Sequence, residues 1–248
     1  MADAEPLLEV ICLHEHDAVR AQAGGADRVE LVGTLDDGGL SPAPELVEKV
    51  RDAVDLEVRV MLRLHGGFDI TGSELSRLRG LAAAYLDSGA DGLVLGFLNG
   101  HAEVDTAVVE ALVEGGDWPW TFHRAIDHAL DPRRAWRALL GLPRLDQVLT
   151  AGSPRGVEHG LDELIGFAGQ DRRIAELIMA GGGLRAEDVP WLCRAGIRAF
   201  HIGTPARPGG SLKAYVDADL VRTWRTLIDD SHRRARRAAT TGPESPAG

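Results

Sequence analysis

Cysteine is scarce in this chain, since its 248 residues include only Cys12 and Cys193. Two cysteines cannot build the disulfide framework of a small secreted protein, so we expect a reducing, cytoplasmic location. Apolar runs are short as well, and none approaches the roughly 18 residues of a membrane-spanning helix. The opening residues, MADAEP, lack the basic start and apolar stretch of a signal peptide. The sequence therefore predicts no membrane partner.

Positive charge is also in deficit. The formal net charge is −11, which argues against general nucleic-acid binding because phosphate contact needs a concentrated positive surface. The one basic cluster, residues 232–237, is expected to be a solvated helix end followed by a disordered tail. Lysine occurs only at Lys49 and Lys213, and neither lies on a predicted strand. A Schiff-base mechanism, which needs a buried lysine amine, is therefore disfavoured.

Eight short apolar segments alternate with longer segments of helical periodicity. Strands are predicted over residues 7–12, 27–33, 57–64, 92–98, 120–125, 146–152, 176–182 and 198–203. Eight such units predict a single-domain α/β protein with a (β/α)8 TIM-barrel fold over residues 7–228. A short N-terminal extension (1–6) precedes it, and a C-terminal helix end with a disordered tail (229–248) follows. A doubly wound open sheet is the alternative, but no Gly-x-Gly-x-x-Gly follows the first strand.

Polar side chains share one face of several predicted strands. Residues two apart in a strand point the same way, and the opposite, apolar face must contact the surrounding helices. The residues that this alternation predicts to point inward include Glu9, Arg28, Glu30, Met61, Arg63, His65, Thr121, His123, Thr150 and His201. Most of the polar ones lie near the C-terminal ends of their strands, where barrel active sites are built. Together they can pair charge with charge, move a proton or hold an anion. For any single residue, a structural ion pair such as Arg28 with Glu30 is the alternative.

The loops after the seventh and eighth strands are rich in glycine. Gly182 and Gly183 follow one strand, and Gly203 and Thr204 follow the other. These loops form the usual phosphate site of TIM barrels, where backbone N–H groups surround an anion. Glycines also simply make turns tight, so a bound phosphate or carboxylate remains one of two interpretations.

An enzyme hypothesis assigns roles within this set. His123 or Glu30 is the general acid/base, and Arg63, with Arg124 as a second candidate, binds a carboxylate or phosphate bidentately. Asp127 orients His123 or Arg124; alternatively, Arg124 and Asp127 form a structural pair in the barrel wall. The catalytic candidates are His123, Glu30, Glu9, Arg63 and Asp127, and the ligand-binding candidates are Arg28, His65, Arg124, Thr150, Gly182, Gly183, His201, Gly203 and Thr204.

Motifs in order along the chain match a known family. Between Leu7 and Thr204, the segments LLEV, GGADRVEL, GGLSP, MLR-x-x-GG-F-D, GADGLVLG, TFHRAID, QVLTAG and IMAGGG resemble the copper homeostasis protein CutC family, and TFHRAID is the most specific of them. The resemblance implies a TIM barrel, a cytoplasmic location and a homodimer or higher homo-oligomer. It also implies a link to copper tolerance, with cysteines as Cu(I) ligands and no firmly defined catalytic activity.

The chain departs from this family where copper ligands are expected. Ile11 and Val32 stand where family members carry cysteine, and His65 follows Arg63 in place of the family's second arginine. Cys12 is the remaining candidate metal ligand, but strand parity points its thiol toward the helices. Because Cu(I) favours thiolate or thioether ligands, the sequence lacks the groups most expected to bind it.

Two functions therefore stay open. The first is a CutC-like cytoplasmic protein of copper homeostasis, with copper as its candidate ligand and cofactor. The second is a TIM-barrel enzyme of lyase, isomerase or hydrolase type that acts on a small phosphorylated or carboxylated substrate. The charged residues that match the family, namely Glu9, Arg28, Glu30, Arg63, His123, Arg124, Asp127 and His201, fit an enzyme active site better than a copper-binding site. A non-catalytic scaffold is a third possibility and would bind no ligand at the mouth.

Overall fold

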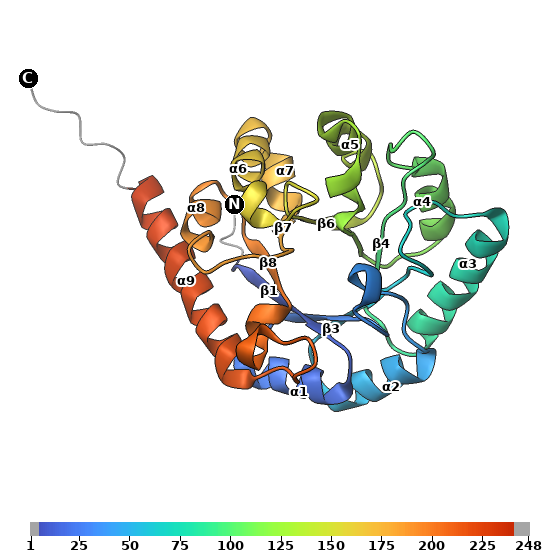
Figure 1. Ribbon diagram of the computed structural model, residues 1–248, viewed down its shortest axis with the longest axis horizontal. Coiled ribbons are helices and arrows are strands. Elements are labelled where there is room, and N and C mark those ends of the chain that lie inside the picture. The colour runs from blue at the N-terminus through green and yellow to red at the C-terminus, as the bar shows by residue number, and fades with distance from the viewer. Residues whose placement is uncertain (1–4, 241–248) are drawn as a thin grey trace, which may run out of the picture.

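Eight parallel strands close into a barrel in sequence order, and β1 pairs with both β2 and β8 (Figure 1). The computed structural model describes residues 5–240. Its strands are β1 (Leu7–Cys12), β2 (Arg28–Leu31), β3 (Glu57–Met61), β4 (Gly92–Leu95), β5 (Trp120–Phe122), β6 (Leu145–Thr150), β7 (Ile178–Ala180) and β8 (Ala199–Ile202). This closed parallel barrel confirms the predicted (β/α)8 fold.

Helices connect the strands and surround the barrel (Figure 1). Local sequence sets where they begin: Thr71 and Glu74 form a reciprocal capping box at α3, and Pro132 follows the capping residue Asp131 at α5. The helices are α1 (Glu15–Gly24), α2 (Pro44–Ala53), α3 (Gly72–Asp87), α4 (Thr106–Val113), α5 (Pro132–Leu139), α6 (Leu161–Gln170), α7 (Arg172–Leu177), α8 (Val189–Arg194) and α9 (Ala218–Thr240).

The alternating strand pattern separates an outer core from an inner one. Outward side chains such as Val29, Leu31 and Phe200 are fully buried in a large apolar cluster between the strands and the helices. Burying each of them contributes about 1.5–3 kcal/mol to stability. Inward positions carry charges instead, and Arg28 and Arg59 are each only 1% exposed. The inner core is therefore held by ion pairs as well as by apolar contacts.

Arg59 is an inward residue that the sequence interpretation missed. Its guanidinium lies 2.5 Å from a Glu57 oxygen and 2.6 Å from an Asp146 oxygen, across the barrel from β3 to β6. The same strand parity that points Met61 and Arg63 inward could have identified it. Because Arg59 lies toward the N-terminal ends of the strands, it stabilises the base of the barrel.

Strand β6 contradicts the predicted parity. Leu149 lies in an inner apolar cluster, whereas Val148 belongs to the outer one. Thr150 therefore faces away from the barrel interior, and its hydroxyl donates a hydrogen bond to Oδ1 of Asp127 at 2.6 Å. That buried carboxylate satisfies the hydroxyl, so a polar group is tolerated in the wall. A register shift in the pairing of β5 with β6 precedes this point.

Several strands end earlier than predicted. Strands β3, β4 and β5 end at Met61, Leu95 and Phe122, because the chain then turns into the loops that build the barrel mouth. His123, for example, is already the capping residue of the short 3-10 helix η2 (Arg124–His128). Strand β7 spans only Ile178–Ala180, since α7 leads directly into it.

Helix α9 continues to Thr240 and includes the basic cluster. Its arginines at 233, 234, 236 and 237 are exposed as expected, but His232 is buried, so this part of the helix is only partly solvated. The predicted tail at 241–248 lies outside the described residues. Within residues 5–240, no helix combines the length and apolar character needed to cross a bilayer.

Candidate functional site

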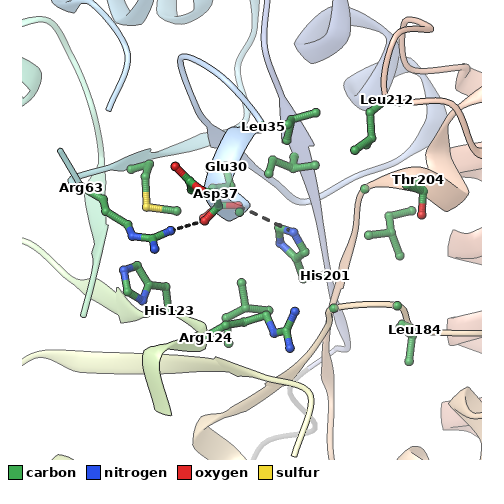
Figure 2. Close-up of a pocket in the computed structure, with 18 of the residues that line it drawn as sticks. Glu30, Leu35, Asp37, Arg63, His123, Arg124, Leu184, His201, Thr204 and Leu212 are labelled. Atoms are coloured by element: carbon green, nitrogen blue, oxygen red, sulfur yellow. Dashed lines mark hydrogen bonds and ion pairs between the residues drawn. The ribbon is translucent and has the colours of Figure 1, made fainter. Parts of the chain in front are cut away.

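A cavity of about 290 Å³ opens at the C-terminal ends of the strands, bounded on one side by the loop around Asp37 (Figure 2). Leu35 and Leu212 stand on its rim, and Met61 and Leu149 line it lower down. Pockets of this size bind small molecules rather than polymers. Of the predicted site residues, the cavity brings together Glu30, Arg63, His123, Arg124, Gly182, Gly183, His201, Gly203 and Thr204.

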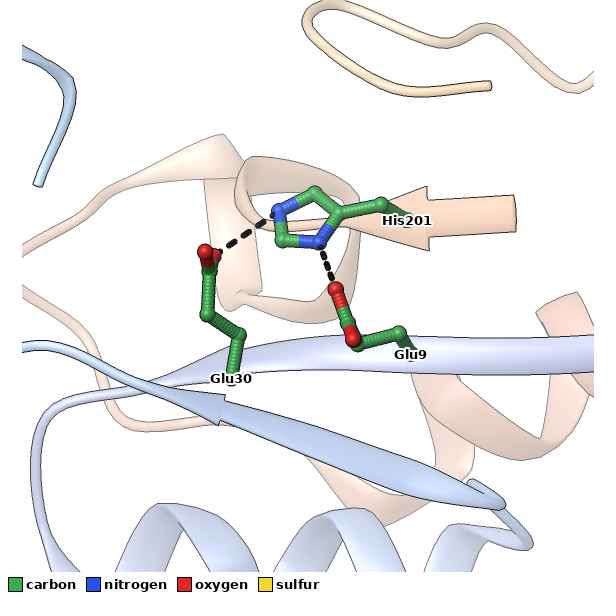
Figure 3. Close-up of side chains that lie close together, drawn as sticks. All are labelled: Glu9, Glu30 and His201. Carbon is green, nitrogen blue, oxygen red and sulfur yellow. Dashed lines mark hydrogen bonds and ion pairs between the residues drawn. The ribbon is translucent and has the colours of Figure 1, made fainter. Parts of the chain in front are cut away.

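His201 joins two buried carboxylates on one side of this cavity (Figure 3). Its Nδ1 lies 2.7 Å from Oε1 of Glu9, and its Nε2 lies 3.7 Å from Oε2 of Glu30. The other oxygen of Glu9 accepts a hydrogen bond from Nε of Arg28 at 2.6 Å. Oε1 of Glu30 is buried and has no partner among the described residues. The predicted pairing of Arg28 with Glu30 is thus wrong, because Arg28 binds Glu9.

The two carboxylates of this network differ in their affinity for a proton. Burial would raise the pKa of Glu9, but Arg28 and His201 outweigh it and lower that pKa to about 2. Burial raises the pKa of Glu30 to about 7, since the attraction of His201 offsets only part of the desolvation and Glu9 adds repulsion. Burial opposes protonation of His201, but its hydrogen bond to Glu9 and the charges of Glu30 and Glu9 raise its pKa overall. The pKa of Glu30 therefore lies near neutral pH, whereas Glu9 stays ionised.

His123 lies across the cavity and is held as a neutral imidazole. Its Nδ1 accepts a hydrogen bond from the backbone N–H of Ala125 at 3.2 Å, so the proton of the neutral ring resides on Nε2. Burial and the nearby charge of Arg63 lower the pKa of His123 to about 3. Nε2 is buried and has no partner among the described residues. His123 therefore suits the role of hydrogen-bond donor, and the acid/base role suits Glu30 better.

Arg63 extends its guanidinium over the aromatic ring of Phe68, 4.8 Å from the ring centre. Three of its N–H groups donate to the backbone carbonyls of Asp37, Gly66 and Gly67, the first at 2.5 Å. The part of the chain that the structure describes provides no carboxylate within 4 Å of this cation. Burial lowers the pKa of Arg63, although Asp37 partly opposes this. Two N–H donors remain for an anion in the cavity.

Arg124 and Asp127 form a pair in the wall of the barrel. Nε of Arg124 lies 2.8 Å from Oδ2 of Asp127, whose side chain is 1% exposed. Asp127 also accepts hydrogen bonds from the Thr150 hydroxyl and the Ala151 backbone N–H. Asp127 and Thr150 thus fix the loop that carries Arg124, and Asp127 makes no hydrogen bond to His123. The structural pair predicted as the alternative is the arrangement found.

Other predicted residues lie away from the cavity. His65 stands beyond the end of β3, where strand parity no longer applies, and its Nε2 lies 3.4 Å from Oε1 of Glu74 near the surface. Glu9 and Arg28 lie within the barrel and do not line the cavity; they act on it through the hydrogen bond of Glu9 to His201 and through their charges, which are felt by Glu30. The sequence interpretation missed Asp37 and Phe68, which hold Arg63; neither lies on a strand, so parity gave no signal for them.

Neither thiol can serve the cavity. Cys12 is fully buried in the outer apolar cluster, as its parity predicts, and burial raises its pKa well above 9. Burial also raises the pKa of Cys193, in α8, to about 12. Donor atoms of Glu9, Glu30 and His201 lie within 4.8 Å of one another, but Glu9 is already bonded to Arg28 and His201. These residues do not provide the soft ligands that Cu(I) prefers.

The fold and the cavity define a (β/α)8-barrel protein with a polar site at the barrel mouth. The model of the CutC family matches residues 7–205. A CutC family protein of Klebsiella pneumoniae (strain 342) is 36% identical over 234 residues, covering 88% of this chain and 92% of that protein. Another, from Xanthomonas axonopodis pv. citri, is 36% identical over 198 residues, covering 78% of this chain and 81% of that protein. The chain belongs to the CutC family.

Solved structures agree with this assignment. The copper homeostasis protein CutC of Streptococcus agalactiae superposes with a TM-score of 0.70 at 25% identity, covering 80% of this chain and 98% of the other. A dihydrodipicolinate synthetase of Pseudomonas aeruginosa superposes with a TM-score of 0.62 at 12% identity, covering 94% of this chain and 80% of that chain. The second similarity extends to the fold alone.

Proposed function

We propose that this protein is an enzyme that moves a proton on a small substrate carrying a carboxylate or phosphate group. The observation that supports this most is that a candidate base and a candidate anion-binding group face each other across one cavity. Glu30, with a pKa of about 7, stands on one side, and Arg63, a buried cation without a carboxylate partner, stands on the other. A base poised near the operating pH and a fixed cation suit proton abstraction next to an anionic group, as in lyases and isomerases.

Each residue has a distinct task in this mechanism. Arg63 binds the anionic group of the substrate, and the Nε2–H of His123 donates a hydrogen bond to an oxygen that gains negative charge. Ionised Glu30 accepts the proton from the substrate. The imidazolium of His201, held by Glu9, then faces the newly neutral Glu30 and keeps its proton available for return. Gly182, Gly183 and Gly203 also line the cavity, and the backbone of Gly183 faces open space that can hold further ligand atoms.

Copper homeostasis is the second candidate, favoured by the description of the S. agalactiae relative. Copper binding would have to use ligands other than the two buried thiols, whose pKa values are both raised. Anaerobic titration with Cu(I) tests this directly, with Cys12→Ser as the comparison. Tight one-to-one binding that persists in Cys12→Ser would favour copper, and no binding to the wild type would rule it out. A cytoplasmic location and a homo-oligomeric state are further expectations of this family membership.

Solvent exchange tests the enzyme proposal. Small carboxylates and phosphate esters are first screened for stabilisation of the wild type against heat, with Arg63→Gln as the comparison. Ligands that require Arg63 are then incubated with the protein in deuterated water, and proton NMR follows the loss of their C–H signals. We expect exchange in the wild type, faster as the pH rises through about 7, and none in Glu30→Gln, which keeps the shape of the site. Equal stabilisation of wild type and Arg63→Gln by every anion would contradict the proposal.

A further inference from the structure

A second cavity adjoins the first at the barrel mouth. It measures about 310 Å³ and lies between the loop that follows β6 and the loop that follows β7. Arg124, Gly182 and Gly183 line both cavities, so the two are neighbours that share this part of their walls. The outer cavity adds residues 154–158 of the β6–α6 loop, including Arg155. A ligand seated on Arg63 could therefore extend outward across Gly182 and Gly183.

Arg124 marks the boundary between the two cavities. Its guanidinium extends toward the loop that carries Leu184 (Figure 2). A Cβ added to Gly182 would lie 2.7 Å from Cζ of Arg124, so only glycine lets the guanidinium pack this closely on the backbone. Gly182 has a φ of +86°, which glycine adopts at little cost. By contrast, a Cβ on Gly183 would meet nothing within 4 Å, so the backbone there faces open space.

Two arginines, Arg124 and Arg155, line the outer cavity together with Glu158. Arg124 is paired with Asp127, and Glu158 lies 3.5 Å from Arg185, which also pairs with Glu187 and Asp188. Arg155 is exposed, and within the described chain its guanidinium has no carboxylate within 4 Å. Nε of Arg124 donates to Asp127 and Nη2 donates to the backbone carbonyls of Ser153 and Pro154, which leaves the N–H groups of Nη1 as further donors on the same side chain. Arg155, which has no carboxylate partner, and Arg124, which has N–H donors to spare, thus line the same cavity.

We propose that the substrate carries two anionic groups, one bound by Arg63 and His123 and the other by Arg124 and Arg155 in the outer cavity. This inference rests on the proposed function and narrows its substrate class to dicarboxylic acids and phosphorylated carboxylic acids. Arg155 is then a specificity-determining residue that selects against substrates with a single charge. Its position at the outer end also means that the group it binds stays away from Glu30, so the reacting atoms lie near the inner group.

Two series of probe ligands test this proposal by titration calorimetry. One series contains straight-chain dicarboxylates from malonate to suberate, and the other contains phosphonocarboxylates of the same lengths; propionate and methylphosphonate serve as single-charge references. In the wild type we expect one chain length in at least one series to bind on the order of tenfold more tightly than its reference, because the second contact becomes intramolecular. The better series identifies the outer group as carboxylate or phosphate.

Two variants test whether the tighter binding of ligands with two anionic groups comes from the outer cavity. Arg155→Gln should remove the dependence on chain length and leave the affinity for propionate unchanged. Arg234→Gln, which removes an exposed arginine of α9 remote from both cavities, is the matched control and should behave as the wild type. If single-charge ligands bind through Arg63 but no length is preferred, or if Arg155→Gln keeps the preference, the two-charge inference is wrong and the proposed function stands. If no anion of either kind requires Arg63, both are wrong.

Discussion

Acidification below pH 6.5 is expected to destabilise the protein through His123. Burial and the charge of Arg63 lower the pKa of His123 from 6.5 to about 3, so between these values the unfolded chain binds a proton that the folded protein does not. The free energy of unfolding then falls by about 1.4 kcal/mol per pH unit. From pH 7 to pH 5 this one imidazole accounts for a loss of about 2 kcal/mol. Only 4% of the residue is exposed, so solvent does not screen the effect.

Urea unfolding of the wild type and of His123→Gln at both pH values measures this contribution. Glutamine has no titrating group in this range, and all other titrations are common to the two proteins and cancel in the difference. The wild type should lose about 2 kcal/mol more than the variant on going from pH 7 to pH 5. Nitrogen NMR of the wild-type imidazole at pH 5 should still show a neutral ring protonated on Nε2. Parallel losses in both proteins, or an imidazolium spectrum at pH 5, would refute the reasoning.

Other buried features lead to further predictions. Glu9→Gln removes the carboxylate closest to the buried Arg28 and leaves only Glu57 at 3.8 Å, so it should lower the free energy of unfolding by about 3 kcal/mol in urea titration; an unchanged midpoint would contradict this. Gly182→Ala should lower thermal stability by at least about 1 kcal/mol more than Gly183→Ala. Both glycines have positive φ, but only at Gly182 would a Cβ meet a guanidinium. The thiol of Cys12 should resist labelling at pH 8 until the protein unfolds, since burial raises its pKa well above 9. Rapid native labelling, detected by mass spectrometry, would show that the thiol is accessible.

Strand parity predicted the inner face of the barrel where the strands are regular. It pointed Glu9, Glu30, His123 and His201 inward, and the structure buries all four. Parity depends on an unbroken extended backbone, however. At β6 it assigned Thr150 to the wrong face, and beyond Arg63 it no longer described the chain, so His65 was misplaced.

The sequence predicted which face of a strand a charged residue occupies better than it predicted the partner with which that residue forms an ion pair or hydrogen bond. Arg28 could pair with Glu9 or Glu30, and only the register of β1 with β2, which sets Glu9 opposite Arg28, decides between them. The tautomer of His123 depends on a backbone N–H two residues later, which becomes available because the chain enters η2. Such contacts arise from loop geometry, and no periodicity in the sequence encodes that geometry.

Closure of the barrel has a consequence for how the protein is made. The hydrogen bond between Glu9 and His201 joins residues 192 positions apart, on the first and last strands. Helix α9 packs against α1, and Arg225 of α9 donates a hydrogen bond to the backbone carbonyl of Pro6. The last helix therefore contacts the segments on both sides of the first strand. During synthesis, the edge of β1 that pairs with β8 stays unpaired until nearly the whole chain has been translated. The site that contains Glu9 and His201 is assembled only in a chain translated through β8, so truncated products have the early strands but not the chemistry.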